Sequence, residues 1–232
     1  MKLVKNKYSF LGIIPARSGS KGIKDKNIII INNKPLIYYT IKKAKESHLL
    51  SDLVVSTDSH KIAKICKKYN IEVPFLRPKK FSTDNSNIIY TLKYTLKKME
   101  KLKNKKYDYV VLLQPTSPKR AIKEIDKSIL KVIKNKSDSL ISLCKLSHPH
   151  PLKLKKIIKN KVYSFKKYID NPPRQSLEQL YMPSGNIYIT RRDLLFKNKI
   201  TGPNAIFNLV DKKNYLNIDS NDDLILAKTK LK

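Results

Sequence analysis

The sequence predicts an α/β fold in which a parallel β-sheet is covered by helices. Strand-like and helix-like stretches alternate along most of the 232-residue chain, as they do when crossover helices join parallel strands. The hydrophobic fraction of 41% is enough for a packed core. A chain of this length suits one substantial domain.

Strands are expected at residues 10–15, 53–57, 109–114, 139–144, 186–190 and 215–218. Helices are expected at residues 36–47, 59–69, 87–102, 121–135 and 221–231. In the second of these helices, apolar side chains recur at positions 62, 65, 66 and 69, which is the spacing of one helix face. The last helix follows Ser220 and opens with acidic residues, a capping-box-like start that suits the positive end of a helix.

The alternation breaks between residues 146 and 183. This stretch carries five prolines, two histidines and a basic run, and it does not have the pattern of a βα unit. We expect residues 1–232 to form a single domain from which residues 146–183 depart as an insertion. Such an insertion would contact substrate or pair with a second subunit.

The formal net charge of +32 favours attraction to polyanions. However, only six of the 50 basic residues are arginine, and the lysines are spread over nearly every segment. The sequence contains no basic motif interleaved with aromatic residues, no zinc-ligand set and no RNP-type sequence. We therefore expect a solvated lysine-rich surface and no specific nucleic-acid partner.

No apolar run approaches the roughly 18 to 20 residues that a membrane span needs, so no membrane partner is expected. The two cysteines, Cys66 and Cys144, fall inside apolar patterns. Buried free thiols are typical of a reducing compartment, which favours a cytoplasmic location.

A basic, glycine-containing loop follows the first expected strand. Residues 14–22 read IPARSGSKG, and residues 25–27 read DKN. Open α/β sheets bind ligands at the carboxyl ends of their strands, and small residues let backbone N–H groups approach phosphate oxygens. Arg17, Lys21 and Lys26 supply positive charge. The spacing matches neither the Walker loop nor the dinucleotide glycine pattern, so a solvated turn is equally compatible with this loop alone.

A second polar turn, LLQPTSPKR at residues 112–120, ends an expected strand and precedes a helix. Gln114 is placed to hydrogen-bond a base or a ribose. Arg120 would face phosphate or cap a helix. The alternative is an ordinary connection between a strand and a helix.

The third motif is NIDS at residues 217–220. Asn217 and Asp219 are two residues apart on an expected strand, so their side chains would share a face. They would then offer two oxygens to one Mg²⁺, with triphosphate oxygens supplying further ligands. The alternative is that this segment caps the last helix.

Together, the three motifs strongly resemble the acylneuraminate cytidylyltransferase family, from about residue 11 to residue 231. Similar landmarks are VSTD at 55–58, LRP at 76–78, PHPLK at 149–153, PRQ at 173–175 and SGNIYI at 184–189. The resemblance implies a three-layer α/β/α, Rossmann-like nucleotidyltransferase with a small inserted dimerisation segment. It also implies the reaction, in which CMP passes from CTP to the anomeric hydroxyl of a nonulosonic acid (sialic, legionaminic or pseudaminic type) and pyrophosphate leaves.

The resemblance also assigns roles to residues, with Arg17, Lys21 and Asp219 as the catalytic set. The nucleotide site would contain Ala16, Arg17, Ser18, Gly19, Lys21, Lys26, Asn27, Arg77 and Gln114. The sugar acid would meet Gln114, Thr116, Ser117, Lys153, Arg174 and Tyr188, of which Lys153 and Arg174 come from the dimerisation segment of a homodimer. Mg²⁺ would be held by Asp219 and Asn217.

Two positions depart from the family pattern. The metal motif is usually D-I-D, whereas its first acid is replaced by Asn217, which leaves the number of metal ions open. A second arginine, common eight residues after Arg174 in the sialic acid enzymes, is Met182 here, which leaves the sugar open. The nearest alternative is the related cytidylyltransferase for the eight-carbon acid KDO, although the SKG and KN sequences of the first loop favour the acylneuraminate branch. An alternative from another class is a polyanion-binding protein on the same fold.

Overall fold

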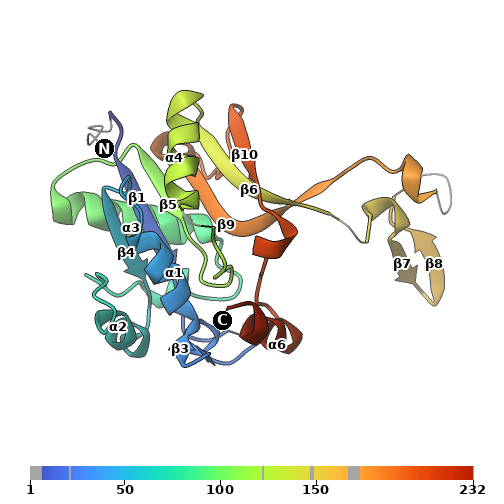
Figure 1. Ribbon diagram of the computed structural model, residues 1–232, viewed down its shortest axis with the longest axis horizontal. Helices are drawn as coiled ribbons and strands as arrows, with labels where there is room; N and C mark the ends of the chain where they lie inside the picture. The colour runs from blue at the N-terminus through green and yellow to red at the C-terminus, as the bar shows by residue number, and fades with distance from the viewer. Residues whose placement is uncertain (1–6, 21, 122, 147–148, 167–172, 232) are drawn as a thin grey trace.

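A six-stranded sheet forms the centre of the computed structural model, which describes residues 7–20, 22–121, 123–146, 149–166 and 173–231 (Figure 1). The strand order across the sheet is β10-β6-β9-β5-β1-β4. These strands are β1 (Phe10–Pro15), β4 (Asp52–Ser56), β5 (Tyr109–Leu112), β6 (Ser139–Lys145), β9 (Tyr181–Arg191) and β10 (Ala205–Leu209).

The sheet is mixed, which corrects the expectation of a purely parallel one. β1 pairs parallel with β4 and β5, and β10 pairs parallel with β6. β9 lies between β5 and β6 and runs antiparallel to both. The chain passes from β6 to β9 through the irregular stretch after residue 145, and an antiparallel neighbour needs no crossover helix.

The strand expected at 215–218 does not form, and β10 takes the sixth place in the sheet instead. Leu216 and Ile218 are apolar at alternate positions because both pack in a small cluster with Ala227 of the last helix. β10 was missed although four of its five residues, AIFNL, are apolar. It lies at the edge of the sheet, and its side chains are exposed or half-buried.

Helices cover both faces of the sheet, which confirms the three-layer α/β/α architecture. Phe10 and Ile14 of β1 pack with α1 (Leu36–Lys45), α2 (His60–Lys67) and α4 (Glu124–Lys134). Leu11 and Ile13 point the other way, toward α3 (Ile88–Lys103) and the short α5 (Arg192–Phe196). Both faces of β1 are therefore buried, as its continuous apolar sequence predicts.

The remaining elements flank this body. A small hairpin of β2 (Ile30–Ile31) and β3 (Lys34–Pro35) lies near α6 (Asn221–Lys230). The 3-10 helices are η1 (Lys26–Ile28), η2 (Lys79–Phe81), η3 (Pro151–Lys153), η4 (Arg174–Ser176) and η5 (Lys212–Asn214). Both cysteines are buried free thiols. Among the described helices, none combines the length and apolar character needed to cross a bilayer.

An arm projects from the body where the sequence pattern breaks (Figure 1). It consists of residues 149–166 and contains η3 and a hairpin of β7 (Lys155–Ile158) and β8 (Lys161–Ser164). β7 and β8 pair only with each other among the described strands. Ile157 and Val162 are cross-strand partners in this hairpin, and they are 76% and 68% exposed. The arm therefore presents exposed apolar side chains that no other described residue covers.

Candidate active site

The three motifs meet at a cavity of about 460 Å³ beside the carboxyl ends of β1 and β5. The loop after β1 contributes Pro15, Arg17, Ser20, Gly22, Lys26 and Asn27. The segment between β4 and α3, together with α3 itself, contributes Arg77, Phe81, Thr83, Asp84, Ser86, Ile88 and Thr91. Gln114, Pro115 and Thr116 follow β5, and Asp219 precedes α6. This position at the strand ends is where open α/β sheets bind ligands.

The loop after β1 is fixed by polar contacts to its neighbours. Asn27 is buried, and its side-chain amide donates to the carbonyl of Arg17 (3.0 Å). Ser18 is turned toward Asp58, which accepts from the Ser18 hydroxyl (2.6 Å) and from its backbone N–H (2.9 Å). Because these contacts hold the backbone, the Arg17 side chain is presented to the cavity from an ordered loop.

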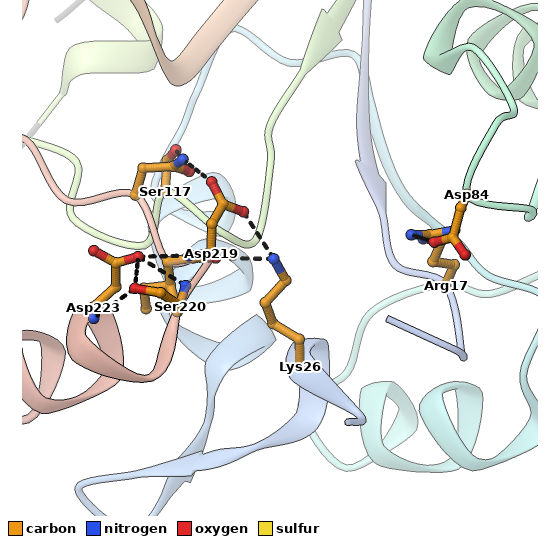
Figure 2. Close-up of polar contacts among 9 residues, drawn as sticks. Arg17, Lys26, Asp84, Ser117, Asp219, Ser220 and Asp223 are labelled. Carbon is orange, nitrogen blue, oxygen red and sulfur yellow. Dashed lines mark hydrogen bonds and ion pairs between the residues drawn. The ribbon is translucent and has the colours of Figure 1, made fainter. Parts of the chain in front are cut away.

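Two cations of the cavity are paired with carboxylates of this chain (Figure 2). Arg17 forms an ion pair with Asp84 and also donates to the carbonyl of Ser82 (3.3 Å). Lys26 Nζ lies 2.8 Å from Asp219 Oδ1 and donates to the carbonyl of Ile218 (3.1 Å). Both cations line the cavity, where each can exchange its carboxylate for another anion.

Arg77 is a third cation in the lining and is only 4% exposed. It donates to Ser82 Oγ (2.9 Å) and to the carbonyl of Ser56 (3.2 Å), so neutral oxygens hold it in place. Burial lowers the pKa of Arg77 to about 10, an effect that nearby Asp58 opposes and Arg17 reinforces. The guanidinium therefore remains charged at neutral pH.

Sequence reasoning missed Ser86, Phe81 and Ile88, which line the same cavity as Arg77. The hydroxyl of Ser86 is buried and has no hydrogen-bond partner in the described part of the chain. It is therefore available to a ligand or a water molecule in the cavity. No sequence signal pointed to it, because residues 79–87 read as an ordinary polar loop.

Arg120 fills neither of its two expected roles, because its contacts in the described residues neither turn it toward the cavity nor cap a helix. Its side chain is 5% exposed and donates to the carbonyls of Asn186 (2.9 Å) and Gln114 (2.9 Å) and to Thr40 Oγ1 (2.8 Å). Burial lowers the pKa of Arg120 to about 10, and Glu124 acts in the opposite direction. Arg120 thus joins α1, β9 and the end of β5 beneath the cavity.

Gly185 lets β9 approach the turn after β5. Its φ of +78° lies in the left-handed region that favours glycine. A Cβ atom at this position would lie 2.3 Å from Ser117 Oγ and 2.9 Å from Gln114 Oε1. Ser117 is itself buried and donates to the carbonyl of Ser184 (3.1 Å). The turn that carries Gln114 is therefore held from two sides, by Arg120 and by β9.

Asp219 does not cap the last helix. The capping box of α6 is formed by Ser220 and Asp223, as the sequence predicts. The Asp219 side chain is instead 63% exposed and reaches the cavity. Asn217 donates its side-chain amide to Asp219 Oδ2, and its oxygen lies 3.5 Å from Ser117 Oγ. The side chains of Asn217 and Asp219 are thus adjacent although residues 217–219 lie outside any strand.

The other residues assigned from sequence lie around or away from the cavity. Ala16, Ser18, Gly19, Ser117, Asn217 and Tyr188 do not line it in the described part of the chain. Tyr188 is half-buried on β9 and packs against the cluster under α3. Lys153 belongs to η3 of the arm. Lys21 and the side chain of Arg174 lie outside the described residues.

Comparison with known proteins agrees with this geometry. Residues 11–214 match the cytidylyltransferase family model. Post-translational flagellin modification protein B of Campylobacter coli is 32% identical, over 94% of this chain and 93% of that protein. CMP-N,N'-diacetyllegionaminic acid synthase of Legionella pneumophila is 34% identical, over 82% of this chain and 81% of that protein. The solved structure of CMP:2-keto-3-deoxy-manno-octonic acid synthetase, complexed with CTP, superposes with a TM-score of 0.71 at 15% identity, covering 96% of this chain and 98% of that one. Because the family model matches most of the chain and both relatives are more than 30% identical over most of their length, this chain belongs to the cytidylyltransferase family.

Proposed function

We propose that this enzyme transfers CMP from CTP to the anomeric hydroxyl of a nonulosonic acid and releases pyrophosphate. One observation carries the proposal: Arg17 and Lys26 of the loop after β1 line one cavity at the strand ends together with Arg77 and Asp219, which come from two other segments. Relatives at 30% identity or more include a legionaminic acid synthase and a pseudaminic acid cytidylyltransferase, which support a nine-carbon acid as acceptor.

Two regions of the cavity suit different parts of CTP. Arg17 and Lys26 are positioned to bind triphosphate oxygens, since both are cations of the loop after β1 and both line the cavity. Arg77 and Ser86 offer a buried guanidinium and an unpartnered hydroxyl beside the apolar Phe81. These groups suit a flat polar ring, so we assign the cytosine to this end of the cavity.

The donor set also suits Mg²⁺ brought by the nucleotide. Asp219 presents an exposed carboxylate to the cavity, and among the described residues no group of three or more His, Cys, Asp or Glu could hold a metal alone. Mg²⁺ commonly takes one or two carboxylates together with substrate phosphates. We therefore propose that Asp219 holds the ion, with Asn217 beside it. When bound, the ion would neutralise charge on the triphosphate.

In the proposed reaction, the 2-hydroxyl oxygen of the sugar acid forms a bond to the α-phosphorus. The bond between that phosphorus and the bridging oxygen to the β-phosphate breaks, the hydroxyl proton passes to water, and pyrophosphate departs. Arg17 and Lys26 hold the charge that develops on the departing group. Arg77 and Gln114 orient the nucleotide, so positioning and charge neutralisation supply most of the rate.

A KDO-type acceptor is the second candidate, because the KDO synthetase structure shares this fold. At 15% identity that likeness shows the fold alone, whereas the relatives with greater identity favour the nonulosonic branch. We also propose a cytoplasmic location, because both cysteines are free thiols.

CTP is expected to be the preferred nucleotide. At about 100 times its Kd, CTP with Mg²⁺ should raise the free energy of unfolding by roughly 2.7 kcal/mol, which is measured as a higher melting temperature. UTP and ATP at the same concentration should raise the melting temperature much less. A coupled pyrophosphate-release assay across sialic, legionaminic, pseudaminic and KDO acids then identifies the acceptor. Equal turnover with UTP or ATP would contradict the assignment, and a polyanion-binding protein would show no saturable preference among the three nucleotides.

We propose further that the enzyme is a homodimer formed through the arm. Ile157, Val162 and Phe165 are 76%, 68% and 56% exposed, an unusual concentration of apolar surface for one short hairpin. A second copy of the chain would cover these side chains. Lys153 and Arg174 would then lie near the sugar site of the neighbouring subunit.

Light scattering at assay concentration is expected to report a dimer. Charging the hairpin by Ile157→Lys with Val162→Lys should give a monomer, because these cross-strand partners share one face. Ile225→Lys is the matched control, since Ile225 is 66% exposed on α6, away from the arm. A wild-type protein that is monomeric and fully active would refute the proposal.

A further inference from the structure

Carboxylates are scarce in this chain, yet two of them line the one cavity described above. Only 18 of the 232 residues are Asp or Glu, against 50 Lys and Arg. Asp84 and Asp219 nevertheless both line the cavity, and each is ion-paired with a cation of the lining. The proposed metal site accounts for Asp219, but the proposed function gives no role to Asp84.

Asp84 lies in the loop between η2 and α3 and pairs with Arg17 (Figure 2). The two side chains are 30% and 29% exposed, so a dissolved anion can reach the guanidinium. Arg17 also donates to the carbonyl of Ser82 (3.3 Å), and Asn27 holds the Arg17 backbone (3.0 Å). The orientation of Arg17 therefore has supports that do not depend on the Asp84 charge.

We propose that Asp84 is a displaceable counter-ion of Arg17, which occupies the place of a phosphate oxygen in the empty enzyme and returns as pyrophosphate leaves. The inference rests on the proposed function, because it takes Arg17 to be a phosphate ligand. A carboxylate and a phosphate oxygen compete for the same guanidinium donors. Asp84 thus weakens the binding of triphosphate and of product pyrophosphate alike, which favours product release.

The test measures binding of inorganic pyrophosphate, and separately of CTP, with Mg²⁺ by calorimetry in the wild type and in Asp84→Asn. The variant should bind pyrophosphate about two- to fivefold more tightly, the range expected when a competing, partly exposed ion pair is removed. Steady-state inhibition by pyrophosphate should strengthen by the same factor. Asp84→Glu keeps the charge and should stay near the wild type.

Asp193→Asn is the matched control, because Asp193 pairs with Arg191 (2.7 Å) outside the cavity lining. It changes the net charge by the same amount and should alter pyrophosphate affinity much less. A second check combines Asp84→Asn with Arg17→Ala. The gain in affinity should disappear in that background, because it acts through Arg17.

Unchanged or weaker pyrophosphate binding in a folded Asp84→Asn protein would overturn the inference, since Asp84 would then support Arg17 or be irrelevant to it. An equal gain from Asp193→Asn would also overturn it, as a mere effect of net charge. Failure of the wild type to bind CTP is a different result, because it contradicts the proposed function itself. If the wild type binds CTP but Asp84→Asn gains no affinity for pyrophosphate, only the role of Asp84 is contradicted.

Discussion

Replacing Asp219 with asparagine is expected to nearly abolish CMP transfer at any practical Mg²⁺ concentration. Asp219 supplies the carboxylate that we assign to the ion. Among the described residues that line the cavity, the only other carboxylate is that of Asp84, which pairs with Arg17. Removing one preorganised group that stabilises developing charge typically costs about 10²- to 10³-fold in rate. The measurement is the initial rate against Mg²⁺ at fixed CTP.

The structure provides a control for helix capping at the same place. Because Ser220 and Asp223 form the capping box of α6, Asp219→Asn should leave the melting temperature nearly unchanged. Asp223→Asn should instead lower stability by about 1 kcal/mol, the usual cost of a weakened cap, while the Mg²⁺ dependence stays near that of the wild type. If Asp219→Asn instead lowered the melting temperature and left the Mg²⁺ dependence of the rate unchanged, Asp219 would have a purely structural role.

The neighbouring Asn217 is expected to set how much Mg²⁺ the enzyme needs. Its amide donates to Asp219, which an aspartate at position 217 cannot do. Asn217→Asp would place two carboxylates side by side, with Lys26 as the cation paired to Asp219. Their repulsion favours a divalent ion, so this variant should reach half-saturation at lower Mg²⁺ than the wild type. An unmoved Mg²⁺ curve, or an active Asp219→Asn enzyme, would place the metal elsewhere.

The fold was predictable wherever burial imposes a pattern on the sequence. β1 begins and ends at the expected residues because helices cover both of its faces and every position from Phe10 to Ile14 is buried. The direction of β9 was not predictable, since nothing in SGNIYI distinguishes a parallel from an antiparallel strand. β10 was missed although its sequence, AIFNL, is mostly apolar. The strand was instead predicted at 215–218, whose alternating apolar residues pack against α6.

The residues of the candidate site likewise fall into those that the sequence predicts and those that it does not. Residues in motifs next to strand ends, such as Arg17 and Gln114, were predicted because the carboxyl edge of a sheet gathers them. Ser86 and Asp84 come from an irregular loop whose position depends on tertiary packing, so no spacing rule could place them. Arg120 was assigned two possible environments from sequence, and only its burial beneath the turn excludes the phosphate.

The phosphate loop should show the second large effect. Arg17→Ala is expected to lower turnover at least about 10²-fold, because Arg17 is the cation of this loop whose guanidinium can bind two oxygens of the departing pyrophosphate. Lys21→Ala is expected to have an effect of similar size, on the basis of the family resemblance. The melting temperature should change little, since Arg17 is a partly exposed loop residue outside the core. The measurement is kcat and KM for CTP at saturating sugar acid.

A matched control separates the loss of this guanidinium from a general loss of positive charge. Arg191 pairs with Asp193 on the surface (2.7 Å) and does not line the cavity, so Arg191→Ala should keep near-normal turnover. Arg17→Lys should recover only part of the rate, because an ammonium keeps the charge but cannot engage two oxygens in the fork geometry of arginine. If folded Arg17→Ala retained the wild-type rate, the loop would be structural, and charge stabilisation of the leaving group would have to come from Lys26 and the metal ion alone.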